Sequence, residues 1–536
     1  MAARTRPGAR RTRRGGRRWT AGGRTRDCGL PRPRSFDPSP VPAVSVLILR
    51  MLRLPALGLA GALLAAPPAA AQGRFTAAPC WFTPPPGESA RCGTVAVPER
   101  RDRAAHRTLH LTVAVLRSTA QRAAPDPVLY IDGGPGASPF GLDDMVEERM
   151  EGWWELTAVL RRTRDVVLFD PRGVGRSEPD TDCAELDVLA GTPRTTAEER
   201  AALEACSTRL RAAGVDLGSF TTPAAADDVM DIAAALGAAR VNLIAVSYGT
   251  RVALEILRRH GPRVRAAVLD GVYPPDINAE EEEAWLTHRA LKRLFDDCTA
   301  SRACRAAFPD LERRFLQLAS DLNALPATVG AGDAPDPLGI RLDGSVLIAA
   351  VLEAMAGDEA IPRLPALIDR AVRGRPAPLA QYAPAPRLDD PDTAEGMAFS
   401  IECRETVNAA DLVRTANNRR RWSVLPGLEG DDTGRRVCAV WPVGGQEPGE
   451  RLPVASTAPV LLLSGAYDPV TPPEWGQRAA ITLPQSRHVV FRAAGHGVLL
   501  GEPCALDLAA AFLDRPDVAK PPVCAPADRP PAFEVR

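Results

Sequence analysis

Ser247 stands in the pattern that a nucleophilic serine requires. Small residues flank it in the segment 245–249, Ala-Val-Ser-Tyr-Gly, after the apolar run 241–246 and before a helical pattern over 250–260. A tight strand-to-helix turn needs small residues on either side, lifts the hydroxyl above the sheet edge and leaves backbone N–H groups free beside it. Ser247 is therefore predicted to be the nucleophile of an acyl-transfer reaction, although the first small residue is Ala where Gly is commoner.

A general base for this serine has to be one of six histidines. In a turn of this type the acid and the histidine follow the serine in the chain. Five histidines fail on chain order or on the element that they occupy: His106, His110, His260, His288 and His488. His496 remains, after the last predicted strand, where flanking glycines let the ring swing toward the serine. We predict that His496 is the base, and an ordinary surface-loop histidine is the alternative.

Asp468 has the position expected of the acid that orients this histidine. It follows the predicted strand 460–463 in the segment 464–469, Ser-Gly-Ala-Tyr-Asp-Pro. A carboxylate at the end of the penultimate strand can fix the tautomer of His496 and stabilise the imidazolium during proton transfer. An aspartate that only begins a turn before Pro469 is the alternative.

The loop 132–136, Asp-Gly-Gly-Pro-Gly, follows the third predicted strand and is the candidate for stabilising a negative oxygen. An oxyanion hole needs two N–H donors, one from the residue after the nucleophile and one from this loop. Tyr248 is predicted to supply the first donor and Gly134 the second, with Gly133 as the alternative to Gly134. A glycine-rich turn without a catalytic role is the competing interpretation.

Eight short apolar runs must position these residues, and they read as strands: Thr94–Val97, Leu109–Leu116, Val128–Ile131, Val166–Phe169, Val241–Val246, Ala266–Leu269, Val460–Leu463 and His488–Phe491. Near-continuous apolar strands that alternate with helices are typical of a mostly parallel sheet covered on both faces. The expected fold class is therefore α/β, with an eight-stranded, mostly parallel sheet flanked by helices. Its core comprises 72–275 and 456–536, and residues 276–455 are expected to form an inserted, mainly helical cap.

The first 71 residues have the composition of segments that precede a mature protein. Residues 1–50 are rich in arginine with almost no apolar periodicity, and we interpret them as a non-native extension. A basic arm for nucleic acid or membranes is the alternative. Residues 51–71 have a basic start, an apolar run and Ala-Ala-Ala before Gln72, the pattern of a secretory signal peptide. The remaining chain is mildly acidic, which argues against nucleic acid as a partner, and no stable membrane anchor is expected.

The cysteine content agrees with a secreted or periplasmic protein. Eleven cysteines are present, and ten follow the predicted signal peptide. An even number suits five disulfides in an oxidising compartment, while the lack of any Cys-x-x-Cys pair disfavours a zinc site. Sequence alone leaves the connectivity open, but near neighbours in chain order give the following pairs: Cys80–Cys92, Cys183–Cys206, Cys298–Cys304, Cys403–Cys438 and Cys504–Cys524.

Three glycine-containing motifs stand at matching places along the chain. They are Gly-Gly-Pro-Gly at 133–136, Asp-Pro-Arg-Gly-Val-Gly-Arg-Ser at 170–177 and Ser-Tyr-Gly-Thr at 247–250. Together they resemble the proline iminopeptidase and tripeptidyl aminopeptidase branch of the α/β-hydrolases, and the secreted, cysteine-containing members most of all. The resemblance runs from about Cys80 to Cys524. Asp132 departs from the histidine of many iminopeptidases, which weakens the transfer of a strict proline preference.

The resemblance implies a serine aminopeptidase that releases residues or short peptides from the free N-terminus of peptides. Such enzymes need an anion for the substrate ammonium, and Glu402 and Glu405, on either side of Cys403, are the candidates. A solvated charged face is the alternative for these two residues. No cofactor or metal is needed, and a monomer is expected. Two other functions stay open, a carboxylesterase for small esters or lactones and a non-catalytic binding module of the same fold.

Overall fold

The computed structural model describes eight stretches of the chain, residues 74–103, 107–141, 145–187, 195–330, 340–384, 393–425, 432–517 and 531–535. All of them belong to the unit Pro67–Arg536, and the unit Met1–Ala66 lies outside them. The predicted extension (1–50), the predicted signal peptide (51–71), His106 and Cys524 also fall outside the described residues. Of the helices in the described stretches, none is both long and apolar enough to cross a membrane.

A nine-stranded sheet forms the centre of the fold, in the order β1 (Phe75–Ala78), β2 (Ala90–Pro98), β3 (Thr108–Leu116), β5 (Val166–Phe169), β4 (Val128–Ile131), β6 (Val241–Val246), β7 (Val264–Asp270), β10 (Val460–Gly465) and β11 (Ser486–Phe491). The three pairings from β1 to β5 are antiparallel, and the five from β5 to β11 are parallel. All eight predicted strands are therefore confirmed in a mostly parallel sheet. The ninth, β1, escaped prediction because it is a short edge strand with three exposed residues.

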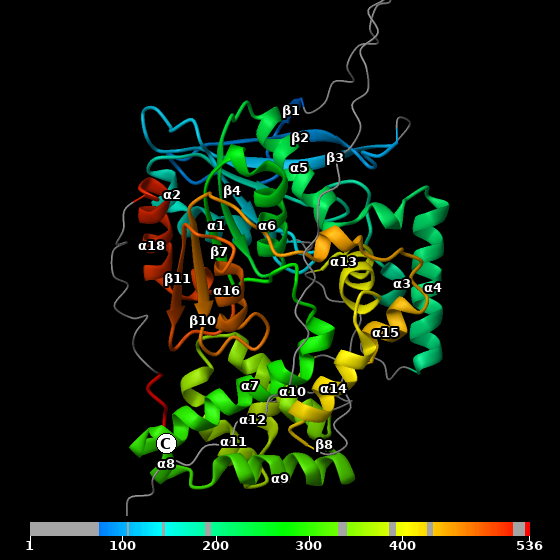
Figure 1. Cartoon of the computed structure of the whole chain (residues 1–536), viewed down its shortest axis with the longest axis vertical. Helices are drawn as coiled ribbons and strands as arrows, with labels where there is room; N and C mark the ends of the chain where they lie inside the picture. Colours follow the sequence, from blue (N-terminus) through cyan, green and yellow to red (C-terminus); the bar gives the residue numbers. More distant parts are fainter. Residues whose placement is uncertain are drawn as a thin grey trace, which may run out of the picture. The chain divides into compact units, whose positions relative to one another are not determined.

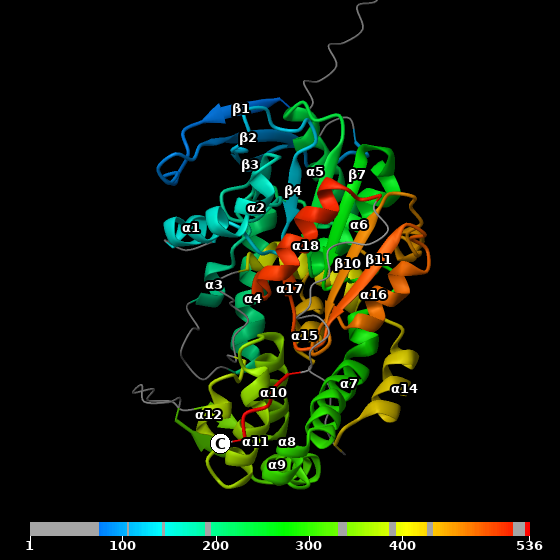
Figure 2. The ribbon, with the colours of Figure 1, turned by 90° about the vertical axis from the view of Figure 1, so that its left-hand side faces the viewer.

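Helices cover both faces of this sheet, because alternate residues of each central strand point to opposite faces. In β6, Leu243 packs in one buried cluster and Ile244 in the other. One cluster includes α5 (Thr222–Ala235), α6 (Tyr248–His260) and α16 (Pro473–Ala480), and the other includes α1 (Val146–Leu156), α2 (Ala158–Arg161) and α18 (Pro503–Asp514) (Figures 1 and 2). Burial on both faces explains why the central strands read as continuous apolar runs.

The first part of the segment between β7 and β10 has a buried core of its own. Its elements are α7 (Ala279–Ala300), α8 (Arg302–Ala307), α9 (Leu311–Ala324), β8 (Ala327–Val329), β9 (Ile340–Leu342), α10 (Gly344–Ala356), α11 (Leu364–Val372) and α12 (Ala377–Ala380). Leu294, Phe315 and Val351 pack together in this core. The antiparallel pair β8–β9 is not among the predicted strands, because three-residue strands are too short to show an alternating pattern.

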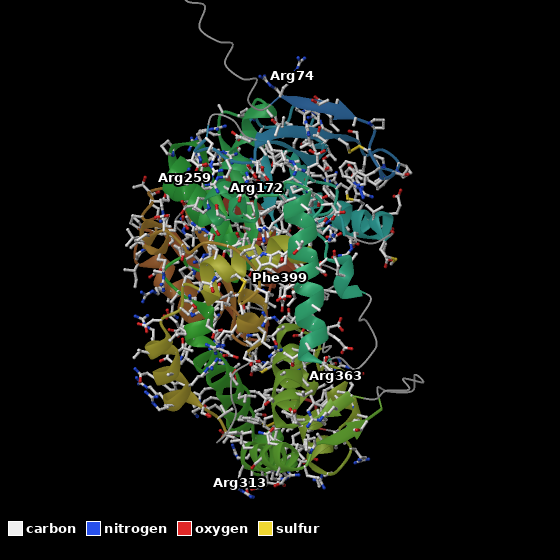
Figure 3. All side chains as sticks on the ribbon, turned by 90° about the vertical axis from the view of Figure 1, so that its right-hand side faces the viewer. Arg74, Arg172, Arg259, Arg313, Arg363 and Phe399 are labelled. Atoms are coloured by element: carbon white, nitrogen blue, oxygen red, sulfur yellow. A yellow bond between two sulfur atoms is a disulfide. The ribbon has the colours of Figure 1, made fainter. Side chains whose placement is uncertain are left out.

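The second part of the same segment packs on the core of the sheet instead. It comprises α13 (Glu395–Glu402), a π-helical turn (Cys403–Val407) and α15 (Thr433–Cys438), whereas α14 (Leu412–Trp422), which lies between them in the chain, packs along α7. Met397, Phe399 and Trp441 join the buried cluster that contains Leu243 of β6 (Phe399 is labelled in Figure 3). The predicted cap, residues 276–455, which we call the cap region, therefore contains two parts with different packing partners.

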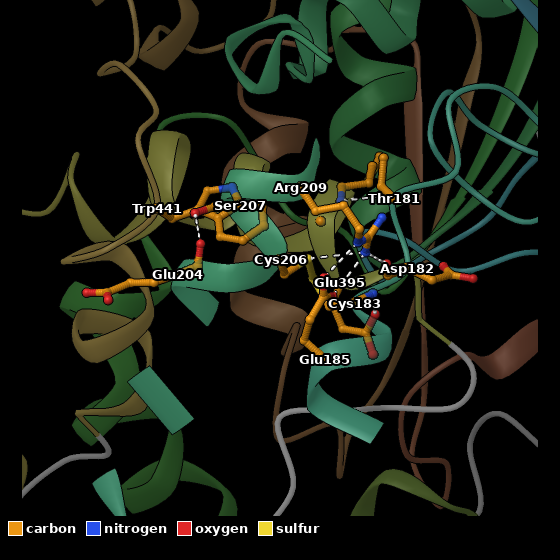
Figure 4. The surroundings of a disulfide bond; sticks show 12 residues. Thr181, Asp182, Cys183, Glu185, Glu204, Cys206, Ser207, Arg209, Glu395 and Trp441 are labelled. Atoms are coloured by element: carbon orange, nitrogen blue, oxygen red, sulfur yellow. Dashed lines mark hydrogen bonds and ion pairs between the residues drawn. A yellow bond between two sulfur atoms is a disulfide. The ribbon is translucent and has the colours of Figure 1, made fainter. Parts of the chain in front are cut away.

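Within the described residues, four disulfides each join a pair that the sequence predicted: Cys80–Cys92, Cys183–Cys206, Cys298–Cys304 and Cys403–Cys438. The pairing Cys504–Cys524 lies partly outside the described residues. Cys183–Cys206 joins the start of α3 (Ala184–Asp187) to α4 (Thr196–Ala212), the helices between β5 and β6. Glu395 of α13 accepts a hydrogen bond from the N–H of Cys183 at 3.0 Å, so this disulfide lies against the second part of the cap region (Figure 4).

Candidate active site

Ser247 occupies a strained turn between β6 and α6. Its backbone has φ 54° and ψ −127°, a left-handed region that non-glycine residues rarely adopt. The turn is possible because its neighbours are small: a Cβ on Gly249 would lie 2.4 Å from the carbonyl oxygen of Ile131. The N–H of Ser247 donates to the carbonyl oxygen of Asp270 at 2.9 Å. Strain of this kind is typical of functional residues, and it exposes the hydroxyl above the end of the sheet.

Asp468 and His496 are hydrogen-bonded to each other. The distance between Asp468 Oδ2 and His496 Nδ1 is 2.9 Å, and the carboxylate is fully buried. Asp468 also accepts hydrogen bonds from the N–H groups of Val470 and Thr471 and from the Thr471 hydroxyl, each at 2.8 Å. These contacts leave Nε2 of His496 as the nitrogen available for chemistry.

The two groups shift each other's pKa in opposite directions. Burial favours a neutral Asp468, but the charge and hydrogen bond of His496 outweigh it and lower the pKa of Asp468. Burial likewise favours a neutral His496, but the charge and hydrogen bond of Asp468 raise the pKa of His496 above its ordinary value. The pair is therefore arranged to stabilise an imidazolium, as the acid and base of a hydrolase must do.

The loop of His496 lies next to the serine turn. A Cβ on Gly271, the residue after Asp270, would lie 3.1 Å from Cε1 of His496, and Asp270 is the residue that holds the N–H of Ser247. Within the described stretches the hydroxyl of Ser247 forms no hydrogen bond with the ring of His496. Such bonds often tighten only when substrate binds. The structure brings the predicted nucleophile, acid and base to one end of the sheet.

Two backbone N–H groups beside Ser247 are available to a ligand. The N–H of Gly133 donates to the side chain of Asp132 at 2.8 Å. The N–H groups of Gly134 and Tyr248, by contrast, donate to no group among the described residues. This arrangement favours Gly134 over Gly133 as the donor from the loop.

Asp170 braces the loop that carries Gly134. Its carboxyl group accepts a hydrogen bond of 2.5 Å from the hydroxyl of Ser138, and burial raises the pKa of Asp170 to about 7. Two residues later, the guanidinium of Arg172 binds both oxygens of Asp228 at 2.6 and 2.8 Å (Arg172 is labelled in Figure 3). The motif 170–177 therefore acts on the site through the loops around it.

A cavity of about 350 Å³ opens beside Ser247, and we call it the serine cavity. Gly134, Ser247 and Tyr248 form its floor, while Ile401 and Glu402 belong to the second part of the cap region. Its other lining residues are Pro135, Arg251, Tyr273, Ala279, Glu280, Glu283, Leu286, Glu405, Thr406, Val407, Gly434, Val470, Thr471 and Trp475. The walls combine apolar and aromatic side chains with a few charged groups, as ligand cavities usually do.

Glu402 and Glu405 both line this cavity but differ in their partners. Glu405 is buried, accepts hydrogen bonds from the N–H and hydroxyl of Thr222 at 2.8 and 2.7 Å, and lies 3.5 Å from both Arg251 and Arg404. Glu402 is accessible from the cavity and has no hydrogen-bond or ion-pair partner in the described part of the chain. Glu402 is exposed, but nearby protein atoms partly desolvate its carboxyl group and raise the pKa of Glu402 to about 7.

Sequence reasoning missed two residues of the site. Thr471 bridges the proposed acid and base, because its hydroxyl lies 2.8 Å from Asp468 Oδ2 and 3.0 Å from His496 Nδ1. An aspartate before a proline favours a turn in which its carboxylate accepts nearby backbone N–H groups, so the sequence indicated that Asp468 would contact the residues just after it. Arg251, which is buried beside Glu405, had no such signal because its partner is distant in the chain.

Comparisons with known proteins agree with this geometry. The sequence profile of a family described as "alpha/beta hydrolase fold" matches residues 126–503. "Tripeptidyl aminopeptidase" of Streptomyces lividans is 27% identical over 476 residues, which cover 83% of this chain and 85% of the relative. "Serine protease Hip1" of Mycobacterium tuberculosis is 25% identical, with coverages of 79% and 85%. "Carboxylesterase B" of the same organism is 29% identical, with coverages of 72% and 77%.

Proposed function

Since this chain belongs to the α/β-hydrolase fold family and is a serine hydrolase, we propose that it acts as a secreted serine aminopeptidase. In this proposal it removes single residues or short peptides from peptides that have a free N-terminus. The names of two relatives, a tripeptidyl aminopeptidase and a serine protease, support peptide substrates. Secretion is supported by the four disulfides, which persist in oxidising compartments.

The proposed mechanism is acyl transfer in two steps. Nε2 of His496 accepts the proton of Ser247 as Oγ attacks the scissile carbonyl, and Asp468 stabilises the imidazolium. The N–H groups of Gly134 and Tyr248 donate to the oxyanion. His496 then gives the proton to the leaving amine, which departs and leaves an acyl-enzyme. Water, deprotonated by His496, attacks this ester and releases the acid and the free Ser247 hydroxyl.

One observation supports the preference for a free N-terminus: Glu402 lines the same cavity as Ser247, and among the described residues its carboxyl group has no partner. An ammonium group of a peptide would provide the missing partner and would lower the pKa of Glu402 from about 7, so that binding ionises it. Glu405 is already neutralised by Arg251 and Arg404 and has little to offer a second cation. We therefore propose Glu402 as the residue that binds the amine, and Glu405 as its support.

A matched pair of peptide anilides tests this function, one with a free amine and one with an acetylated amine. Wild-type protein is expected to cleave the free-amine substrate far better. Glu402→Gln should lower kcat/KM for that substrate by about 10- to 100-fold, the range for losing a hydrogen bond to a charged group, and should hardly affect the acetylated one.

Glu280→Gln is the matched control, because Glu280 lines the same cavity but pairs with Arg435 at 3.1 Å. It should change the ratio between the two substrates by less than about threefold. Equal cleavage of both substrates by wild-type protein would contradict the aminopeptidase proposal. Preferential cleavage of small esters would instead support a carboxylesterase, the function named for one relative.

A further inference from the structure

Asp270 lies between the strands that carry the proposed nucleophile and the proposed acid. It is the last residue of β7, opposite Val246 of β6 on one side and Leu463 of β10 on the other. Its carbonyl oxygen accepts the N–H of Ser247 at 2.9 Å, and the N–H of the next residue, Gly271, donates to Leu463 at 3.1 Å. The backbone of Asp270 is thus bonded directly to the serine turn.

The side chain of Asp270 points to the other half of the site. Its Oδ2 accepts the N–H of Leu499 at 2.7 Å, and Leu499 belongs to α17 (Val498–Gly501), the short helix directly after His496 and Gly497. One residue therefore connects the serine turn through its backbone with the base loop through its carboxylate. Neither connection involves the side chain of Ser247, Asp468 or His496.

The burial of the Asp270 carboxylate costs too much folding free energy to be explained by packing alone. Asp270 is fully buried, and its Oδ1 has no hydrogen-bond partner among the described residues. Val246, opposite Asp270 on β6, and Val268, two residues earlier on β7, are buried apolar residues, and the charged groups that act on Asp270 are His496 and Asp468. A buried, half-satisfied carboxyl group destabilises a fold, so its presence beside a functional site indicates a functional role.

Asp270 also acts on His496 through its charge. Burial raises the pKa of Asp270 to about 6, and its carboxylate in turn helps to raise the pKa of His496. The other charged groups that act on this ring are Asp468, from the loop after β10, and Glu353, from α10. An imidazolium at 496 therefore lies near two buried carboxylates, of which only Asp468 is hydrogen-bonded to the ring.

We propose that Asp270 is a positioning residue that holds the base loop against the serine turn and stabilises the charged form of His496. This inference rests on the catalytic roles proposed for Ser247 and His496. The backbone hydrogen bond from Ser247 and the side-chain hydrogen bond from Leu499 fix the spacing between nucleophile and base. The negative charge adds to the field of Asp468 when the imidazolium forms.

Two substitutions separate the two parts of this role. Asp270→Asn keeps an oxygen that can accept the N–H of Leu499 but removes the charge, whereas Asp270→Ala removes both. Asp270→Asn is expected to lower kcat about tenfold, to leave KM unchanged and to move the acid limb of the kcat/KM profile to lower pH, because His496 loses a neighbouring anion. Asp270→Ala should lower kcat by about 100-fold, as a misplaced catalytic group does.

The rate of labelling by a fluorophosphonate probe is the deciding measurement, because it depends on Ser247 and His496 and not on the peptide substrate. Asp411→Asn is the control, since Asp411 also accepts N–H groups at a helix start, from Val413 and Arg414 at 2.9 and 3.1 Å. A wild-type protein that fails to label would overturn the catalytic roles. Labelling of Asp270→Asn at the wild-type rate, with an unchanged pH profile, would overturn the role of Asp270 alone. If Asp270→Ala does not fold, Asp270→Asn decides the question.

Discussion

The serine turn and the loops of the acid and base are supported in different ways. The turn around Ser247 is fixed by neighbouring strands, since its N–H bonds to Asp270 of β7 and Gly249 packs on the end of β4. The base loop is held from the cap region: the N–H of His496 donates to the carbonyl oxygen of Ala356 at 2.8 Å, and that of Gly495 to Asp358 Oδ1 at 2.5 Å. Ala356 is the last residue of α10, and Asp358 follows two positions later.

The acid loop has a similar dependence on the cap region. Arg289 of α7 donates to the carbonyl oxygen of Asp468 at 3.1 Å, and the hydroxyl of Tyr467 donates to Asp297 of the same helix at 2.6 Å. The proposed nucleophile is thus held by the sheet, while the proposed acid and base are held by the sheet and by α7 and α10. We therefore expect that residues of the cap region affect turnover without touching substrate.

The largest loss of activity is expected for a change in the serine turn, which the sheet supports. Ser247→Ala is expected to lower kcat by about a millionfold, because the acyl-enzyme can no longer form. It should also abolish labelling by a fluorophosphonate probe. The melting temperature should stay at or above the wild-type value, since removal of the hydroxyl leaves the strained turn itself in place. Residual labelling of this variant would mean that another residue is the nucleophile.

The second largest loss of activity is expected for a change of the proposed acid, Asp468. Asp468→Asn keeps the shape of the side chain but is expected to lower kcat by about 10⁴-fold, because an amide cannot hold His496 in the required tautomer or stabilise its charge. Steady-state kinetics at several pH values measure this loss. Asp297→Asn is the control and should retain most of the activity, because asparagine keeps an oxygen that accepts the hydroxyl of the neighbouring Tyr467. Full activity of Asp468→Asn would mean that another residue is the acid.

Local patterns explain what the sequence could predict here. The central strands were recognisable because they are buried on both faces, and four cysteine pairs because the partners are near neighbours in the chain. Chain order and the predicted elements together led to Asp468 and His496, which are hydrogen-bonded to each other.

Contacts between distant segments explain what the sequence could not predict. Glu402 and Glu405 have the same chemistry and nearly the same position in the chain, but Glu405 also contacts Thr222 and Arg251, which are far away in the sequence. The supports of the base loop, Ala356 and Asp358, belong to another element and carry no motif. A single sequence gives no signal for pairings of this kind.

A smaller loss of activity is expected for a substitution in the cap region. Asp358→Ala removes the acceptor of the Gly495 N–H and is expected to lower kcat about tenfold, with little change in KM, because the base loop shifts while the serine cavity stays intact. Asp369→Ala is the control from the same region, since Asp369 pairs with Arg314 and Arg373 instead. Equal losses in the two variants would indicate general destabilisation, and the contrast between sheet-held and cap-held residues would then be wrong.

The finest test concerns the charge of His496. The ring must be neutral to accept a proton, and its pKa lies above the ordinary value of 6.5, because Asp468 outweighs the effect of burial. Activity should therefore fall as the pH drops through a midpoint above 6.5. Glu402 ionises in the same range, so the profile should be measured as the rate of fluorophosphonate labelling in a Glu402→Gln background. Because Asp468 is fully buried and the side chain of His496 is only 21% exposed, salt should move this midpoint little. A midpoint near pH 5 would show that Asp468 does not stabilise the charged ring, and the acid loop would then have no electrostatic role.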